Sequence, residues 1–385
     1  MEGIVLALFI CLLLALISKY LSVPAIPFYI LAGVLLGKAG LGLVSSDEIS
    51  RFFSDMGLIF LLFFMGLGLK PERIAANRTA VLTSGIIDLN VNMAIGFVGA
   101  YLLGFTVIES LIVASAFYIS STAMAITSLI ENRKLMLREA ETVIWLMVFE
   151  DLVLIIFLAL ISAGNQNLII FVAKILGVLA VLYALAHYGK EFLISILDRD
   201  DELPIIFTFA AVLTTASISM YLGIPETMMV IALGVAFATT DPDAFEQHAR
   251  PFKDVFLVVF FVFFGVTIDF SGGVNWYVIS VICLLAIMSK LISGVLTGIV
   301  IHGSALSGLE IWGNTIGRGE FSIAIAVLYA SSGLVSPLVG TTIAAMVIVT
   351  SIIGSFTAKY STSLRRGILG LGRKKSPPHR VHSSR

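Results

Sequence analysis

The amino-acid sequence predicts an all-α polytopic membrane protein with about thirteen transmembrane helices, arranged as two inverted six-helix repeats. The prediction depends on an apolar composition, a series of long apolar runs, and a similarity between the two halves of the chain. Hydrophobic residues make up 58% of the 385 residues and charged residues only 13%, with a mean hydropathy of +1.04. Soluble domains carry about 25% charged residues, so this composition excludes soluble enzymes and nucleic-acid-binding proteins.

Apolar runs separated by turn or charge clusters give the predicted spans. Pro24, Pro204, Pro225 and Pro337 fall at predicted helix starts, where a missing backbone N–H costs nothing. No basic segment precedes the first run, so we expect a retained helix rather than a signal peptide. The predicted spans are 3–19, 24–37, 54–69, 79–104, 106–129, 138–163, 168–188, 203–222, 225–239, 252–268, 274–301, 306–332 and 337–359.

The basic residues between these spans predict the orientation of the chain in a cell membrane. Loops after even-numbered spans hold little beyond Lys38 and Arg51, whereas loops after odd-numbered spans are rich in Lys and Arg. Because cytoplasmic loops carry the excess of basic residues, we expect the N-terminus outside and the C-terminus in the cytoplasm. The residues that give this bias are Lys19, Lys70, Arg73, Arg78, Arg133, Lys134, Arg138, Lys190, Arg199, Arg250 and Lys253.

The two halves of the chain resemble each other at an offset of about 200 residues. The matches pair span two with span nine and span three with span ten. A shift by an odd number of spans reverses the direction of crossing, so the two halves are inverted relative to each other, as in many secondary transporters. The matched residues are Tyr20, Leu21, Pro24, Gly33 and Val34 with Tyr221, Leu222, Pro225, Gly234 and Val235, and Asp55, Leu58 and Gly66 with Asp254, Leu257 and Gly265.

The repeat gives the predicted domain organisation. Residues 1–360 form a transmembrane domain with repeat one at about 1–163, a linker helix at 168–188, and repeat two at about 203–359. Residues 361–385 are basic and contain Pro and Ser, so we expect a disordered cytoplasmic tail close to anionic lipid. No Gly-x-Gly-x-x-Gly follows a strand, so we expect no nucleotide-binding domain.

Two adjacent acidic residues, Glu150 and Asp151, lie at the middle of an otherwise uncharged run, 143–161. A carboxylate near the centre of a bilayer costs several kcal/mol, so such residues usually face a cavity and mark an ion or proton path. Two in succession are hard to explain as packing. The pair therefore predicts the ion site of a transporter.

Two predicted spans are interrupted at positions that correspond in the two halves. Span five contains the hydroxyl cluster Ser120, Ser121 and Thr122, and span twelve contains Arg318 and Glu320 among glycines. Broken helices at matching positions indicate a transporter binding site. The alternatives are that the hydroxyls pack ordinary helices and that Arg318 and Glu320 form a structural ion pair inside the bundle.

Lys290 is the remaining charge at membrane depth, and it requires a carboxylate partner. Glu150, Asp151 and Glu320 are the candidates. We favour the 150–151 pair because the repeat places span eleven opposite span four, beside the core of the helix bundle. Asp88 belongs to a second polar patch in span four, which either lines the same cavity or hydrogen-bonds between helices. No histidine or cysteine has metal-ligand spacing, so we expect neither a metal site nor a cofactor.

These motifs together resemble the monovalent cation:proton antiporters of the second cation:proton antiporter group, which includes Kef-type potassium efflux proteins and bacterial sodium/proton antiporters. The resemblance covers residues 1–360. It implies the sodium/proton antiporter fold, with a mobile core containing two crossed broken helices and a second domain that forms a homodimer. The motifs that carry the resemblance are Pro24 with the run 32–37, then 120–123, 149–151 and 317–322.

The resemblance also implies roles for individual residues. Asp151 would be the carboxylate that binds cation and proton in alternation, completed by the Ser121 and Thr122 hydroxyls. Glu150 would occupy the preceding slot, where relatives hold Asp, Asn or Gln, and Lys290 would pair with it. Kef-type relatives continue into a cytosolic nucleotide-binding domain. For the basic tail of this chain, docking of a separate regulatory subunit is the alternative to a disordered segment close to anionic lipid.

The predicted function is therefore secondary active exchange of a monovalent cation, K⁺ or Na⁺, for protons, and not an enzymatic reaction. Ser120, Ser121, Thr122, Glu150 and Asp151 form the predicted ion and proton site, with Lys290, Arg318 and Glu320 as charge partners. The alternatives are a sodium-coupled organic-anion symporter of related fold, a gated cation channel, and a structural or sensory membrane protein. Sequence spacing leaves the choice of cation, the stoichiometry and the direction of transport open.

Overall fold

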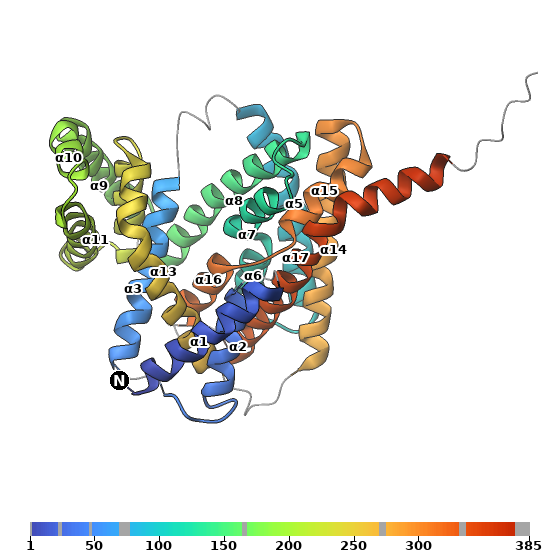
Figure 1. Cartoon of the computed structure of the whole chain (residues 1–385), viewed down its shortest axis with the longest axis horizontal. Helices are drawn as coiled ribbons and strands as arrows, with labels where there is room; N and C mark the ends of the chain where they lie inside the picture. Colours follow the sequence, from blue (N-terminus) through green and yellow to red (C-terminus); the bar gives the residue numbers. More distant parts are fainter. Residues whose placement is uncertain are drawn as a thin grey trace, which may run out of the picture.

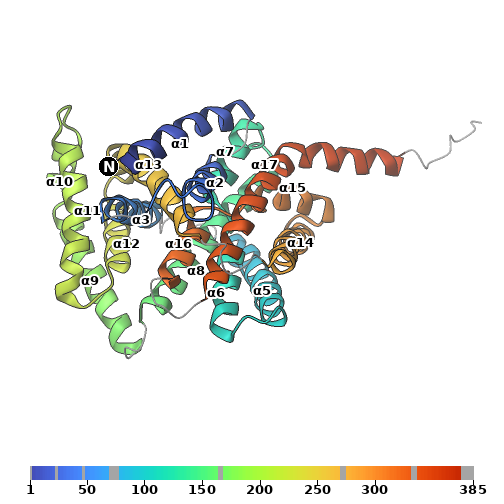
Figure 2. The same cartoon turned by 90° about the horizontal axis from the view of Figure 1, so that it is seen from below.

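The computed structural model describes residues 2–21, 25–45, 48–68, 78–163, 168–268, 275–330 and 336–373. Within these ranges the chain forms sixteen α-helices packed into one bundle (Figures 1 and 2). Of these helices, seven are long and apolar enough to cross a membrane unaided. Pro24, Lys70, Arg73 and the tail from Lys374 onward lie outside the described residues.

The helices follow the apolar runs of the sequence. The first half contains α1 (Glu2–Leu21), α2 (Ile26–Leu36), α3 (Glu48–Gly68), α5 (Arg78–Leu102), α6 (Val107–Tyr118), α7 (Thr122–Glu131) and α8 (Arg138–Ala163). The second half contains α9 (Leu168–Tyr188), α10 (Lys190–Leu197), α11 (Leu203–Leu222), α12 (Glu226–Phe237), α13 (Pro242–Thr267), α14 (Trp276–His302), α15 (Ala305–Thr315), α16 (Glu320–Ala330) and α17 (Pro337–Arg373).

Most predicted spans coincide with these helices, but three features differ. α13 begins at Pro242 rather than at 252, where the Asp241 side chain caps it by accepting from the Ala244 backbone N–H at 3.0 Å. α17 continues past the predicted end at 359 to Arg373, so the first part of the predicted tail is helical and projects from the bundle (Figure 1). α10 is an additional eight-residue helix. Hydropathy marks the apolar part of a helix, whereas backbone hydrogen bonding continues into polar flanks.

Four glycines from the predicted repeat let the two halves of the chain pack backbone to backbone. A Cβ added to Gly33 of α2 would lie 2.8 Å from the Gly265 Cα of α13. A Cβ added to Gly66 of α3 would lie 2.9 Å from the Gly234 Cα of α12. The repeat matches Gly33 with Gly234 and Gly66 with Gly265, so the two contacts are equivalent under exchange of the halves. Small residues allow this close approach between membrane helices.

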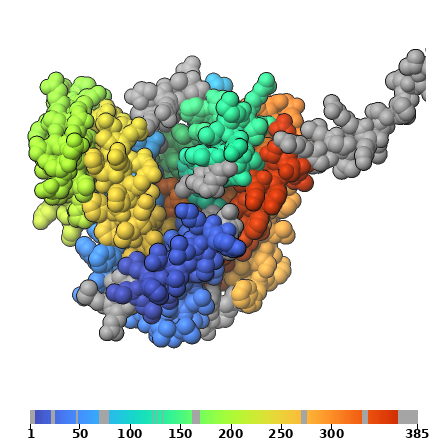
Figure 3. All heavy atoms as spheres, in the orientation of Figure 1, coloured from blue at the N-terminus to red at the C-terminus, as the bar shows by residue number. Residues whose placement is uncertain are grey.

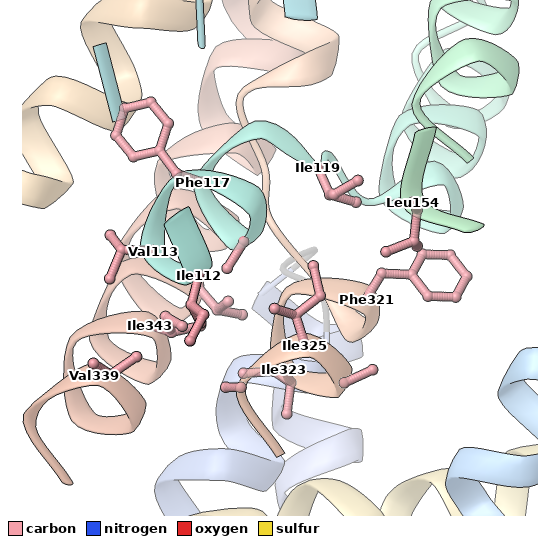
Figure 4. Packing of buried hydrophobic residues seen from close by; sticks show 14 of the residues in the cluster. Ile112, Val113, Phe117, Ile119, Leu154, Phe321, Ile323, Ile325, Val339 and Ile343 are labelled. Carbon is pink, nitrogen blue, oxygen red and sulfur yellow. The ribbon is translucent and has the colours of Figure 1, made fainter. Parts of the chain in front are cut away.

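A large apolar cluster surrounds the centre of the bundle. Ile119 from the α6–α7 connection, Leu154 of α8 and Phe321 of α16 belong to it and are buried (Figure 4). In contrast, α1 lies on the surface of the bundle (Figure 3) and exposes apolar side chains such as Phe9 and Leu12, as expected for a helix in contact with lipid. The connections that interrupt the helices, such as the one at Ile119, are therefore enclosed by protein rather than by lipid.

Candidate ion-binding site

Two helix breaks meet at the centre of the bundle. α6 ends at Tyr118 and α7 begins at Thr122, whereas α15 ends at Thr315 and α16 begins at Glu320. The Ser121 backbone N–H donates to the Gly317 carbonyl at 2.8 Å, which joins the two connections directly. The Ser322 hydroxyl donates to the Ala116 carbonyl at 2.8 Å. Each break thus satisfies backbone groups of the other, as an opened helix within a membrane requires.

Arg318 neutralises the helix ends that these breaks create. Its Nε donates to the Phe117 carbonyl at 2.7 Å, at the C-terminus of α6, and its Nη1 donates to the Ile316 carbonyl at 2.6 Å, just after α15. The side chain is fully buried. Because helix C-termini carry partial negative charge, a guanidinium placed between two of them is favourable. Arg318, predicted as a charge partner, thus binds backbone carbonyls.

Glu320 lies apart from that guanidinium. Among the described residues, no carboxylate is within 4.0 Å of the Arg318 nitrogens, so the alternative of an Arg318–Glu320 ion pair does not form. Instead, Glu320 accepts a hydrogen bond from the Ser121 hydroxyl at 3.1 Å and begins α16. Its position in the first turn is favourable, because helix N-termini carry partial positive charge.

The Glu150 carboxylate of α8 is bound both by Ser120 of the first helix break and by the ammonium group of Lys290. The Ser120 backbone N–H donates to Glu150 Oε2, and the Ser120 hydroxyl lies 3.1 Å from Oε1. Lys290 Nζ of α14 donates to the same Oε1 at 2.7 Å. Both charged side chains are at most 1% exposed. Both carboxylate oxygens of Glu150 therefore accept hydrogen bonds, and the side chain is enclosed by its partners.

Asp151, the next residue, has a different environment. It is partly exposed, and its Oδ1 atom is buried without a hydrogen-bond partner. The side chain of Thr122 lies beside it, and the Thr122 hydroxyl oxygen also lacks a partner. Glu150 and Glu320 are both within electrostatic range of Asp151. These two adjacent unpartnered oxygens, with two further carboxylates nearby, form a suitable environment for a cation or a proton.

Asp88 of α5 is part of the same cluster, although it is absent from the predicted site. Lys290 Nζ donates to Asp88 Oδ2 at 2.6 Å, so the ammonium group lies between two carboxylates, Asp88 and Glu150. The sequence contains a signal for this contact: Asp88 and Lys290 are 202 residues apart, close to the offset of the repeat. This separation indicates that the two positions lie near each other, but it does not show that their side chains point toward each other.

Comparison with known proteins places the chain in a family. Residues 5–361 match the family described as "Sodium/hydrogen exchanger, transmembrane". The K(+)/H(+) antiporter subunit KhtU of Bacillus subtilis is 30% identical over 380 residues, which cover 94% of this chain and 93% of that protein. The Na(+)/H(+)-K(+) antiporter GerN of Bacillus cereus is 26% identical, covering 90% of this chain and 92% of that protein.

A solved structure has the same fold. The sodium proton antiporter MjNhaP1 of Methanocaldococcus jannaschii superimposes with a TM-score of 0.71 at 19% identity, over 95% of this chain and 98% of that one. The chain therefore belongs to the sodium/hydrogen exchanger family, and it is a multi-pass monovalent cation/proton antiporter rather than an enzyme.

Proposed function

We propose that this antiporter exchanges K⁺ or Na⁺ for protons by alternating access, with Asp151 binding the cation and the proton in turn. The observation that carries the proposal is the unpartnered Asp151 Oδ1 beside the unpartnered Thr122 hydroxyl oxygen. A buried polar atom without a partner is costly, so an oxygen left in this state is suited to a ligand that arrives during turnover.

One carboxylate can serve both ions. Hard monovalent cations prefer oxygen ligands, which Asp151, Thr122 and the carbonyls opened by the breaks can supply. A site that reorients empty through a low-dielectric region must not carry a bare charge. Protonation of Asp151 removes that charge, so each half-cycle carries either the cation or the proton.

The names of the relatives narrow the transported cation to a few candidates but do not select one. Relatives of similar coverage are named for K(+)/H(+) exchange, for Na(+)/H(+)-K(+) exchange and for ammonium/H(+) exchange. We propose K⁺ or Na⁺ as substrate and include ammonium in the test.

The test is proton flux in proteoliposomes that contain a pH-sensitive dye. Addition of K⁺, Na⁺, Li⁺ or ammonium to the wild-type protein should move protons in the opposite direction for the transported cation. Asp151→Asn should abolish this exchange while the protein still inserts and keeps its oligomeric state. Asp201→Asn is the matched control, because Asp201 is an exposed loop residue paired with Arg199. Normal cation-driven proton flux in Asp151→Asn would contradict the proposal.

The same assay separates the alternatives. A gated channel would pass cations down their gradient without proton countermovement. A sodium-coupled organic-anion symporter would require an organic anion before sodium moved. The four carboxylates Asp88, Glu150, Asp151 and Glu320 argue against an anionic substrate, because they would repel it.

Assembly and orientation are also proposals. We expect a homodimer in the cell membrane with the N-terminus outside and the C-terminus in the cytoplasm, as the loop charges predict. Two relatives are named antiporter subunits, which supports a separate regulatory subunit. The projecting end of α17 is the part of the described chain that is best placed to receive it (Figure 2).

A further inference from the structure

The buried charges around the helix breaks divide into two groups. Asp88, Glu150, Lys290 and Arg318 form the first group, which we call the charge cluster. Lys290 donates to both carboxylates of the cluster, and Arg318 is within electrostatic range of both. With two acidic and two basic side chains, the charge cluster is neutral. Asp151 and Glu320 form the second group, and neither is within 4.0 Å of a basic side chain among the described residues.

Asp88 is fixed in place by donors from α5 and α14. Its Oδ2 accepts from Lys290 at 2.6 Å, and its Oδ1 accepts from the Ser293 hydroxyl at 2.6 Å and from Asn92 Nδ2 at 2.8 Å. All four side chains are buried. A buried carboxylate with this many internal donors is held rigidly in one position.

The hydrogen bonds around Asp88 follow the symmetry of the internal repeat. The offset of 201 residues pairs Asp88 with Ser289 and Asn92 with Ser293. The Ser293 hydroxyl donates to Asp88 at 2.6 Å, and at the equivalent contact the Ser289 hydroxyl donates to Asn92 Oδ1 at 2.7 Å. The contact between α5 and α14 is therefore a symmetric hydrogen-bond network. The repeat counterpart of Asp88 is the uncharged Ser289, so the equivalent contact forms without a carboxylate.

We propose that Asp88 is a positioning residue whose charge balances Lys290, so that the charge cluster is neutral and the adjacent Asp151 site keeps its affinity for the cation. Without Asp88, the cluster carries one excess positive charge beside the site where a cation must bind. Coulomb repulsion in a buried region acts over several ångströms and is weakly screened by salt. The inference rests on the proposed exchange at Asp151.

The experiment is a double-mutant cycle on the charges. Asp88→Asn gives the cluster an excess positive charge, and the KM for the transported cation should rise about tenfold. Lys290→Gln gives an excess negative charge, and the KM should fall below the wild-type value. The double variant Asp88→Asn with Lys290→Gln is neutral again, and its KM should return to within about threefold of wild type.

Cation-dependent thermal stabilisation of the purified protein measures the same affinity without transport. The control is Asn90→Ala on α5, because Asn90 is exposed and its one hydrogen bond to a described residue is to Ile86 of its own helix. It should leave the KM unchanged. If Asp88→Asn alone does not fold, the double variant is compared with Lys290→Gln, and loss of the carboxylate must still weaken cation binding about tenfold.

A structural role for Asp88 predicts a different order. The melting temperature of the double variant would then be at least as low as that of Asp88→Asn. The KM for the cation would show no systematic dependence on the charge of the cluster. That result would overturn the inference. A wild-type protein that exchanges no cation for protons would instead overturn the proposed function, so the two failures can be told apart.

Discussion

Lys134 and Glu310 form an ion pair at 2.9 Å outside the ion-binding site, with side chains only 4% and 1% exposed. Lys134 lies in the connection between α7 and α8, and Glu310 lies in α15, the half-helix that precedes the second break. The Ser361 hydroxyl of α17 donates to the same Glu310 oxygen at 2.8 Å. The pair therefore ties both broken helices to α17 at one end of the bundle.

Replacing only Lys134 should destabilise the protein strongly. Lys134→Met leaves the Glu310 carboxylate buried without its counter-charge, which costs about 3–5 kcal/mol in comparable proteins. The double variant Lys134→Met with Glu310→Met removes both charges and should recover most of that loss. The measurement is the melting temperature in detergent.

The control for this prediction is Lys190→Met, because Lys190 is exposed at the start of α10. It should change the melting temperature little. Equal losses in the single and double variants would show that Lys134 acts through packing and not through the ion pair.

The glycine contact between α3 and α12 gives a second prediction. A Cβ on Gly234 would lie 2.3 Å from the Phe63 carbonyl oxygen, so Gly234→Ala requires the two helices to separate. We expect a cost of about 1–3 kcal/mol, seen as a lower melting temperature and a lower yield of folded protein. Gly265→Ala, at the equivalent contact, should behave in the same way.

Gly177 is the matched control for these two variants. It lies in α9, and a Cβ added there meets no atom within 4 Å. Gly177→Ala should be neutral or should stabilise the helix, because Ala is the better helix former by about 1 kcal/mol. A loss at Gly177 equal to that at Gly234 would contradict the packing argument.

The sequence predicts helices better than it predicts contacts. The limits of α8, α9 and α11 follow from apolar runs flanked by charge or proline, so each was predictable from local information. The second partner of Lys290, Asp88, was not among the candidates, because the carboxylate that faces a lysine depends on the rotation of each helix about its axis. A shift of one residue along a helix turns a side chain by about 100°.

The contacts of Arg318 were also not predictable from the sequence, for a different reason. One alternative from the sequence paired it with Glu320, but the helix breaks offer carbonyl oxygens that carry partial negative charge. Those acceptors are created by the fold and are invisible in the sequence. The position of the break, in contrast, was predictable, because glycines flank the charge and the hydroxyl cluster lies at the corresponding position of the first half.

Arg318→Lys should therefore impair the protein although it keeps the positive charge. The guanidinium reaches the carbonyls of Phe117 and Ile316, and also that of Ala286 at 3.3 Å, from three different nitrogens. A lysine has one ammonium group and cannot reach all three positions. Each buried carbonyl left without its donor costs about 1–3 kcal/mol, so both the melting temperature and cation-driven proton flux should fall.

Arg199→Lys is the control for the loss of a guanidinium. Arg199 is 53% exposed and pairs with Asp201 in a loop, where a surface ion pair contributes about 0–1 kcal/mol. It should leave flux and melting temperature unchanged. If Arg318→Lys also retained wild-type values, charge alone would suffice at the breaks, and the fork of donors between the two half-helix ends would have no role in holding them together.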